Sequence, residues 1–295
     1  MGAMLKGRKV LITGGAGFLG RALVSRILPM NPREIVVASR DEVKHANMRQ
    51  AFPDVIYIVA DVRDQQRIRR ATHGVDVIIH AAAMKRVESC AFDPQEAIKT
   101  NVVGSQNVVE AALDNEVPIV IGISSDKACN PLNLYGSTKA TMEKLFLSAN
   151  SYNLGGVPRF SVVRYPNVLG STGSVIPLFL QQKKTGVIPI THMEMTRFVI
   201  TADDAVNLIL NTIEAEQPGL YMPPDLAAMR IVDMARIIAP DAELRLVGTR
   251  PGEKLYEVMW ENDDGTFCAS NFPPRWFQEK ELVAWLDKQY PGWSQ

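Results

Sequence analysis

Short runs of β-branched residues alternate with amphipathic helical patterns through the first half of the chain. The apolar runs are KVLIT, EIVVAS, VIYIVA and VDVIIHAAA, and segments such as FLGRALVSRIL and VKHANMRQAF lie between them. This alternation predicts parallel strands joined by crossover helices, because parallel neighbours cannot be connected by a tight turn. We therefore expect an α/β fold with a doubly wound parallel sheet covered by helices on both faces.

A glycine-rich turn, TGGAGFLG, follows the first apolar run and opens the first helical pattern. Glycine allows a tight turn and close approach of the backbone to a pyrophosphate, while the helix N-terminus offers N–H groups to the anion. Glycine clusters also occur in ordinary loops, but the strand–turn–helix context favours a Rossmann-like dinucleotide site. The residues expected to contact the cofactor here are Gly14, Gly17, Phe18, Leu19 and Gly20.

The alternation ends a little beyond the middle of the chain. Helical patterns near residues 94–115 and 135–150 are separated by the run VPIVIGIS and followed by FSVVRY. After Tyr165, glycine and proline become frequent, and helical segments such as DDAVNLILNTIEAE stand alone. We expect a dinucleotide-binding domain over residues 1–165 and a smaller, irregular substrate-binding part over residues 166–295, with interleaving of the two left open.

Composition excludes several classes of partner. The 295 residues are 46% hydrophobic, enough for a substantial core, and 32 basic residues balance 32 acidic ones. No overall positive field exists to hold a nucleic acid or an anionic membrane, and no apolar run is long enough to span a bilayer. Three widely spaced cysteines and four scattered histidines form no metal-ligand pattern, and we expect reduced thiols in the cytoplasm and no metal site.

The end of the second strand bears on the choice between NAD and NADP. An acidic residue there would bind the ribose 2′-hydroxyl, but this chain has Ser39 and Arg40 first and Asp41 just beyond. Arg40 can pair with a 2′-phosphate and Ser39 can donate a hydrogen bond to it, which favours NADP. If Arg40 is only a solvated surface charge, Asp41 is left to bind NAD. Asp61 and Val62, at the end of the third strand, are expected to hold the adenine.

The stretch SSDKACNPLNLYGSTK carries most of the reactive side chains. Tyr135 and Lys139 are four residues apart on a predicted helix, so both side chains emerge on one face. A lysine cation beside a phenol favours the phenolate, and we expect it to lower the pKa of the tyrosine toward the range of a general base. Ser124 or Ser125, ending the preceding strand, can hold a substrate hydroxyl in line. Such a pair also occurs on surfaces by chance, but this helix follows the fifth strand of a nucleotide-binding sheet, where ligands bind.

Together, the glycine turn, the serine-rich strand end and the Tyr-x-x-x-Lys pair resemble the extended short-chain dehydrogenase/reductase family. The resemblance is strongest to the soluble, inverting UDP-N-acetylglucosamine 4,6-dehydratases, which make the first intermediate of pseudaminic acid. It rests on SRDEVK (39–44), AAAMKRVESCAFDPQEAIKTNVVGSQNVVEAA (81–112), SSDKACNPLNLYGSTK (124–139), FSVVRYPNVLGSTGSVIPLF (160–179), MTRFVIT (195–201) and RPGEKLYEVM (250–259). These segments span nearly the whole chain, and the adjacent Asp126-Lys127 and the RPGEK segment are not general features of the wider family.

The resemblance implies a reaction that uses NADP and UDP-N-acetylglucosamine. Tyr135 would take the proton of the sugar 4-hydroxyl as hydride leaves carbon 4, and Lys139 would also hold the nicotinamide ribose. Lys127 would remove the acidified proton of carbon 5, Asp126 would protonate the departing 6-hydroxyl, and hydride would return to carbon 6. Ser125 is expected among the catalytic residues with these groups. Reprotonation of carbon 5 on the opposite face would invert it.

The adjacent charges of Asp126 and Lys127 leave their individual roles open. A base lysine must be neutral and an acid carboxyl must be protonated, yet adjacent ions stabilise each other's charged forms. Burial and the Lys139 cation oppose ionisation of Lys127, whereas the same cation keeps Asp126 ionised. The chemistry is therefore assigned to the pair rather than to either residue. The alternative without a catalytic role is an exposed salt pair in a turn.

The resemblance also implies binding residues. Those expected at the cofactor are Ala81, Lys85, Asn101, Ser124, Tyr135 and Lys139, and those expected at the substrate are Lys85, Arg164, Asn167, Arg197, Arg250 and Glu253. Each arginine alone would more often lie on a surface, and Asn101 could instead make only local hydrogen bonds. Two positions depart from the family: Ser125 stands where threonine is usual, and Thr172 stands where relatives commonly carry arginine.

Three alternative functions share parts of this pattern. A retaining 4,6-dehydratase or a 4-epimerase of a UDP-sugar would use the same hydride chemistry, but epimerisation requires no elimination and therefore no Asp126-Lys127 pair. The retaining, membrane-anchored dehydratases tend to have methionine at position 135. A non-catalytic NADP-sensing module would commonly lose the Tyr135 and Lys139 pair. We therefore expect an enzyme of the hydro-lyase class that forms a homo-oligomer.

Overall fold

The computed structural model describes residues 5–152 and 155–294, and the chain divides into two compact units. The first unit comprises the chain up to Arg164 together with Ala202–Met222, and the second comprises Tyr165–Thr201 and the chain from Pro223 onward. The sequence predicts a boundary between two parts of the chain near residue 165. The segment Ala202–Met222 lies beyond this boundary but belongs to the first unit. Its helix contacts the first helix of the chain, which explains this assignment.

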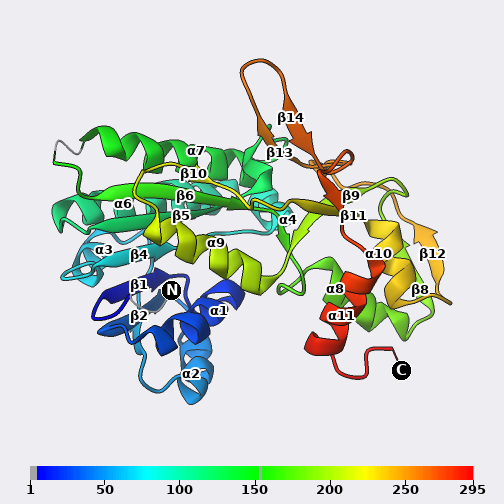
Figure 1. The fold of residues 1–295 in the computed structure, drawn as a ribbon, viewed down its shortest axis with the longest axis horizontal. Coiled ribbons are helices and arrows are strands. Elements are labelled where there is room, and N and C mark those ends of the chain that lie inside the picture. Colours follow the sequence, from blue (N-terminus) through cyan, green and yellow to red (C-terminus); the bar gives the residue numbers. More distant parts are fainter. Residues whose placement is uncertain (1–4, 153–154, 295) are drawn as a thin grey trace. The chain divides into compact units, whose positions relative to one another are not determined.

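The first unit is built on a seven-stranded sheet (Figure 1). Its strands are β1 (Lys9–Thr13), β2 (Glu34–Ser39), β3 (Ile56–Val59), β4 (Val77–His80), β5 (Ile119–Ser125), β6 (Arg159–Tyr165) and β10 (Leu220–Tyr221). They lie in the order β10-β6-β5-β4-β1-β2-β3. β1 pairs in parallel with both β2 and β4, so the strand order reverses beside β1, as in doubly wound nucleotide-binding sheets.

Helices cover both faces of this sheet. They are α1 (Phe18–Ile27), α2 (Glu42–Ala51), α3 (Gln65–Ala71), α4 (Val87–Phe92), α5 (Pro94–Ile98), α6 (Gly104–Asp114), α7 (Leu134–Ala149) and α9 (Ala202–Glu214), with 3-10 helices at Leu28–Met30, Asp126–Ala128 and Asn150–Tyr152. α3, α6 and α7 pack on one face, and α1 and α9 contact each other on the other (Figure 1). Strands sandwiched in this way are mostly apolar, and β4, with the sequence VIIH, is buried at every residue.

Local sequence signals set where α7 begins and how closely it approaches the end of β5. Asn133 is the N-cap of α7, and its side chain accepts a hydrogen bond from the backbone N–H of Gly136. A Cβ atom at Gly136 would lie 2.3 Å from the carbonyl oxygen of Lys127, so only glycine permits this contact. The start of α7 is thereby held against the 3-10 turn that contains Asp126 and Lys127.

A π-helix, Lys99–Val103, joins α5 to α6. The sequence predicts one continuous helix from about 94 to 115, and the structure instead widens this helix around Asn101. The side chain of Asn101 leaves the helix to make hydrogen bonds elsewhere, and the Ser105 hydroxyl donates to the Asn101 carbonyl at 2.6 Å. Widened turns of this kind occur frequently at functional sites.

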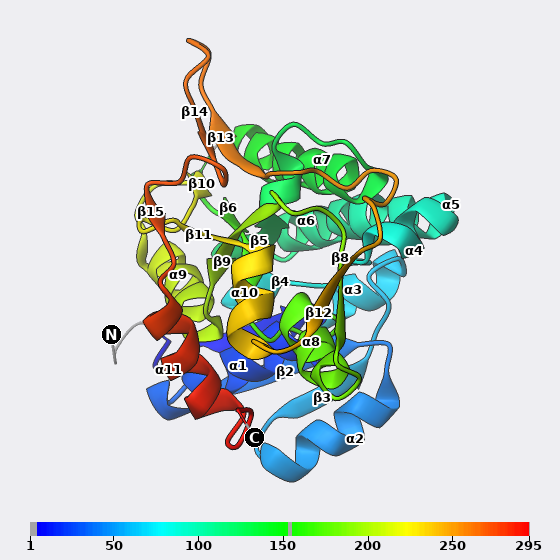
Figure 2. The same cartoon turned by 90° about the vertical axis from the view of Figure 1, so that its right-hand side faces the viewer.

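The second unit contains short strands and three helices among its described residues. Its elements are β7 (Asn167–Val168), α8 (Val175–Lys183), β8 (Val187–Ile190), β9 (Thr196–Ile200), β11 (Ala227–Arg230), α10 (Ile231–Ile238), β12 (Glu243–Leu246), β13 (Val258–Glu261), β14 (Phe267–Ala269), β15 (Arg275–Trp276) and α11 (Glu279–Gln289). A four-stranded sheet has the order β15-β11-β9-β7. α10 packs against both α8 and α11 around an apolar core of its own (Figure 2).

Candidate active site

The carboxyl ends of the parallel strands gather the predicted site residues of the first unit. Ser39 ends β2, Ser124 and Ser125 end β5, and the glycine turn and Ala81 follow β1 and β4 directly. Because β1 lies between β2 and β4, these strand ends are neighbours at the point where the strand order reverses. Ligands of open α/β sheets bind at this edge.

The glycine turn after β1 has the close backbone approach that a pyrophosphate site requires. Gly14 has a φ of +67°, and a Cβ atom there would lie 2.7 Å from the backbone of Ala82. A Cβ at Gly20 would lie 2.1 Å from the carbonyl oxygen of Gly15. Gly17 is the N-cap of α1 and no side chain caps this end, so the first N–H groups of the helix can face an anion. The turn therefore fits the diphosphate of a dinucleotide.

The region that would contact the adenosine is a network of side-chain hydrogen bonds and ion pairs. Asp61 accepts hydrogen bonds from Arg63, whose guanidinium also bonds to Glu96, and Arg40 lies 3.8 Å from Asp61. Burial would raise the pKa of Asp61, but the hydrogen bonds from Arg63 outweigh it and hold this pKa below its usual value. Asp41 is used as the N-cap of α2 and accepts from the backbone N–H of Lys44 at 2.9 Å.

Tyr135 is buried at the start of α7, and its protonation differs from the sequence expectation. Burial raises its pKa to about 12, and the influences that oppose this rise are the Lys127 ammonium and a hydrogen bond with Ser125. The sequence predicts that Lys139 lowers this pKa. That prediction is wrong for this structure, because the effect of burial on the phenol exceeds that of the neighbouring charges.

Lys139 is itself 5% exposed and donates a hydrogen bond to the carbonyl oxygen of Ile123. Burial lowers its pKa from 10.5 to about 8, and the nearby carboxylate of Glu143 partly opposes that effect. Lys139 is therefore still protonated at neutral pH, but its pKa lies only slightly above that pH. A modest change in its surroundings is enough to change its charge.

Asp126 and Lys127 form a direct ion pair in the 3-10 turn after β5. The Lys127 Nζ atom lies 3.1 Å from Asp126 Oδ1, which also accepts a hydrogen bond from the Ser125 hydroxyl at 2.8 Å. The Asp126 side chain is fully buried, and its Oδ2 atom has no hydrogen-bond partner among the described residues. The expected alternative of an exposed turn pair is therefore wrong.

Glu143 is a buried acidic residue that sequence reasoning missed. Ser124 donates to its Oε1 at 2.6 Å, and Arg164 donates to Oε1 and Oε2 at 2.9 and 2.6 Å. Ser124 and Arg164, expected at the cofactor and at the substrate, are thus brought together by this carboxylate. Glu143 follows Lys139 by four residues on α7, so its helical spacing is the signal that could have found it.

Asn101 fixes the loop that follows β4. Its side chain accepts from the backbone N–H of Met84 at 2.8 Å and donates to the Met84 carbonyl at 2.9 Å and to the Thr138 hydroxyl at 3.0 Å. The alternative of purely local hydrogen bonds is therefore wrong. Lys85 is the next residue in this loop, and partial burial of its ammonium lowers its pKa.

The remaining predicted substrate residues lie in the second unit, and three of them come together. Arg197 Nη2 lies 3.8 Å from Glu253 Oε1, and the backbone N–H of Arg250 donates to Glu253 Oε2 at 3.1 Å. Arg197 is 8% exposed and donates to the carbonyls of Thr196, Lys254 and Leu255. Its guanidinium therefore holds the RPGEK segment in place. Asn167 lies in β7, which pairs in parallel with β9.

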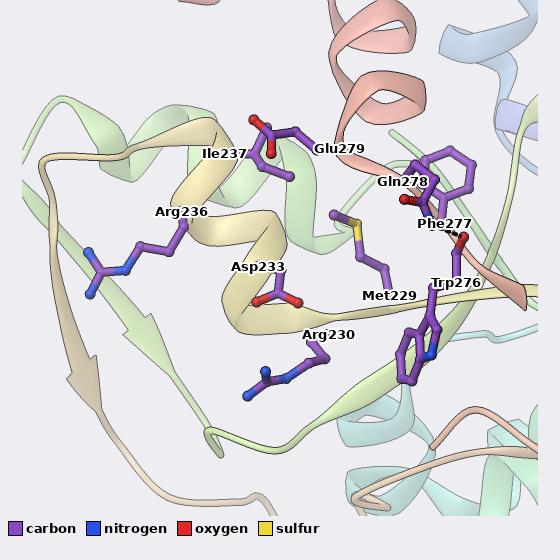
Figure 3. Close-up of a pocket in the computed structure, with 9 residues that line it drawn as sticks. All are labelled: Met229, Arg230, Asp233, Arg236, Ile237, Trp276, Phe277, Gln278 and Glu279. Carbon is purple, nitrogen blue, oxygen red and sulfur yellow. Dashed lines mark hydrogen bonds between the residues drawn. The ribbon is translucent and has the colours of Figure 1, made fainter. Parts of the chain in front are cut away.

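A cavity of about 410 Å³ opens in the second unit, between the start of α10 and the start of α11 (Figure 3). Arg230, Asp233 and Trp276 are among the residues that line it (Figure 3). No residue predicted from the sequence lines this cavity. We therefore do not identify this cavity with the site of the chemistry, although it is large enough to hold a small molecule.

The parts of the chain that the structure describes contain neither a membrane-spanning helix nor a cluster of metal ligands. Within residues 5–152 and 155–294, no helix has the length and apolar character needed to cross a membrane. The same residues contain no cluster of three or more histidine, cysteine, aspartate or glutamate side chains suited to a metal ion.

Comparison with known proteins agrees with this geometry. Residues 10–272 match the family described as "Polysaccharide biosynthesis protein". The chain is 42% identical over 266 residues to a UDP-N-acetylglucosamine 4,6-dehydratase (inverting) of Campylobacter jejuni, covering 88% of this chain and 80% of that protein. It is 41% identical over 272 residues to a UDP-glucose 4-epimerase of Rickettsia conorii, again covering 88% and 80%. The solved structure of Pen from Bacillus thuringiensis has a TM-score of 0.91 at 30% identity, over 97% of this chain and 98% of that one.

Proposed function

Because the chain belongs to the polysaccharide biosynthesis protein family and has the fold of an extended short-chain dehydrogenase/reductase, we propose that it is an NADP-dependent UDP-N-acetylglucosamine 4,6-dehydratase that inverts carbon 5. Relatives of nearly equal identity carry the names of a dehydratase and of an epimerase. The choice between these reactions therefore depends on the side chains at the end of β5.

The observation that carries the proposal is the Asp126–Lys127 ion pair beside Tyr135, in which the carboxylate is fully buried and the lysine is partly exposed. A 4-epimerase must move a hydride and a proton at carbon 4, for which Tyr135 and Lys139 suffice. Loss of water across carbons 5 and 6 needs, in addition, a base for the carbon proton and an acid for the leaving hydroxyl. The pair provides these two groups 3.1 Å apart and close enough to Tyr135 to influence its pKa.

One proton transfer reconciles the ion pair with the roles that elimination needs. In the ion pair, the Lys127 ammonium donates to the Asp126 carboxylate. Moving that proton along the hydrogen bond gives a neutral amine and a carboxylic acid, with no change in total charge. Asp126 Oδ2 has no hydrogen-bond partner among the described residues, so this oxygen is left to pass a proton to a substrate hydroxyl. Lys127 is then the base for carbon 5 and Asp126 the acid for the 6-hydroxyl.

Bound NADP would supply the hydride acceptor for carbon 4 and the hydride donor for carbon 6. Tyr135 must be a phenolate to accept the proton of the 4-hydroxyl, and it becomes a neutral phenol in doing so. Before the proton moves from Lys127 to Asp126, the Lys127 ammonium and a hydrogen bond with Ser125 favour that phenolate against the effect of burial. Lys139 is positioned by its hydrogen bond to the Ile123 carbonyl and would hold the nicotinamide ribose of the bound cofactor. Glu143 keeps Ser124 and Arg164 in fixed positions behind these groups.

Two features support NADP over NAD. Asp41, the acidic residue nearest the end of β2, directs its carboxylate to the first turn of α2 and not to a ribose. Arg40 has an exposed guanidinium, which is available for a 2′-phosphate. For the sugar nucleotide, we propose that Arg250, Glu253 and Asn167 contact the substrate, and that Arg197 acts by holding the RPGEK segment.

The test is to incubate the purified protein with NADP and UDP-N-acetylglucosamine and to analyse the sugar by mass spectrometry and proton NMR. We expect a product lighter by one water, with a methyl group at carbon 6, a ketone at carbon 4 and an L-configured ring. A product of unchanged mass with carbon 4 inverted would identify an epimerase. An unchanged sugar with bound NADP would identify a sensing module, and a D-configured ketone would identify a retaining dehydratase.

A further inference from the structure

His45 has a buried contact with the cofactor end of β2 that no role described above explains. Its Nε2 atom lies 2.7 Å from the hydroxyl oxygen of Ser39, and the imidazole is 4% exposed. The ring lies 5.6 Å from the ring of Tyr57, whose hydroxyl donates to the Phe52 carbonyl at 3.0 Å. These contacts hold the imidazole in one orientation, with Nε2 toward Ser39.

The proton on this imidazole decides what Ser39 can offer to a ligand. If Nε2 carries a proton, it donates to the Ser39 oxygen, and the serine proton is left for a ligand oxygen. If Nε2 is bare, Ser39 donates its proton to His45 and can only accept from a ligand. A phosphate needs donors, whereas a ribose hydroxyl can donate to an acceptor. The presence or absence of a proton on His45 Nε2 therefore decides whether Ser39 favours a 2′-phosphate or a 2′-hydroxyl.

The charged groups around His45 act in both directions. Burial is the main influence that lowers the pKa of His45, the Arg49 guanidinium lowers it further, and the Asp41 carboxylate raises it. Arg49, one helical turn after His45 on α2, lies over the ring of Tyr57 at 5.1 Å from the ring centre. A phosphate dianion next to Ser39 would favour a proton on Nε2, because that proton lets the serine donate to the anion.

We propose that His45 is a positioning residue for cofactor choice, which donates to Ser39 so that the serine hydroxyl donates to the 2′-phosphate of NADP. The proposal rests on the NADP part of the proposed function. It does not depend on the reaction at the sugar, because the contact involves only the adenosine end of the cofactor.

The test measures dissociation constants of NADP and NAD by calorimetry, without sugar, for the wild type and three variants. His45→Phe keeps an aromatic ring beside Tyr57 but has no donor, and we expect NADP to bind about tenfold to a hundredfold more weakly while NAD changes little. His45→Gln keeps an N–H group that can reach Ser39, and we expect it to restore much of the NADP affinity. The exposed His73→Gln is the matched control and should change neither constant.

Two further readouts separate positioning from a merely structural role. Combining His45→Phe with Ser39→Ala should weaken NADP binding no more than either change alone, because both remove the same hydrogen bond to the phosphate. Because burial lowers the pKa of His45 from 6.5, any proton uptake by the imidazole on NADP binding belongs to the acidic range. In that range, NADP affinity of the wild type should fall with rising pH more steeply than that of His45→Gln, which has the same phosphate titration but no imidazole.

Equal loss of NADP and NAD affinity in His45→Phe, additive losses in the double variant, or a wild type that prefers NAD would each overturn the proposal. Failure of the dehydratase reaction would leave these binding constants unaffected, so the two proposals fail separately.

Discussion

The Nζ atom of Lys127 lies 3.1 Å from Oδ1 of Asp126, and the Asp126 side chain is completely buried. The carboxylate has one oxygen in hydrogen bonds and one without a partner among the described residues. A buried charge with half of its hydrogen-bonding capacity unused is costly in a structural pair. In an active site, the unpartnered oxygen of Asp126 is instead available to pass a proton from this side chain to the leaving hydroxyl of the substrate.

Replacing Asp126 by asparagine should separate oxidation from elimination. The amide keeps the shape of the side chain but cannot protonate the 6-hydroxyl, so we expect dehydration to slow by about a hundredfold to ten-thousandfold. Oxidation at carbon 4 should continue, and reduced nicotinamide should accumulate in absorbance measurements. The exposed Asp54→Asn is the control. A variant that forms product at the wild-type rate would exclude Asp126 as the acid.

Gly14 and Gly74 offer a matched pair for testing the cofactor turn. Both have positive φ, +67° and +64°, but a Cβ atom at Gly14 would meet the backbone of Ala82 at 2.7 Å, whereas Gly74 faces open space. Alanine at either site costs about 1–2 kcal/mol for the left-handed backbone. Only Gly14→Ala should also abolish cofactor binding, measured by calorimetry. Normal cofactor affinity in that variant would contradict the pyrophosphate assignment.

Glu143→Gln should destabilise the fold more than a surface change of the same kind. Arg164 would remain as a buried cation without its carboxylate partner, and we expect a loss of roughly 3–5 kcal/mol in the free energy of unfolding, measured with urea. Asp114→Asn, which breaks the exposed pair with Arg69, should cost no more than about 1 kcal/mol. Adding Arg164→Met to Glu143→Gln should recover stability. If it does not, the two side chains do not act as a pair.

Lys139 should make folding stability depend on alkaline pH. Burial lowers its pKa from 10.5 to about 8, so between these values the unfolded chain binds more protons than the folded one. The free energy of unfolding should therefore rise with pH across this window, by on the order of 3 kcal/mol. In Lys139→Met this rise should be missing, which urea titrations at both ends of the window would reveal. An identical pH dependence in both proteins would contradict the depressed pKa.

Much of the first unit could be predicted from sequence, because its strands and helices follow local periodicity. The run EIVVAS is strand β2 from Glu34 to Ser39, and the predicted helix near 135–150 is α7. The two-residue strand β10 could not be predicted, because Leu220 and Tyr221 become a strand only by pairing with Val162 and Val163 of β6. Such a short strand leaves no periodic signal.

The grouping of the candidate-site residues could be predicted where they are close in sequence. Asp126, Lys127, Tyr135 and Lys139 lie within one short segment, and the structure keeps them in one turn and one helix. The partnership of Glu143 with Arg164 joins residues on different elements, and the raised pKa of Tyr135 comes from burial. Both depend on tertiary packing, which local spacing does not reveal.

The most direct test of the central claim follows deuterium into carbon 5 of the sugar during turnover in heavy water. The wild type with NADP and UDP-N-acetylglucosamine should give a 4-keto product with deuterium at carbon 5, seen by NMR, since Lys127 removes that proton and solvent replaces it. Lys127→Met should form almost none of this product, while the exposed Lys144→Met should match the wild type. A Lys127→Met protein that still makes the deuterated product at the normal rate would contradict the assignment of the Asp126–Lys127 pair to the elimination.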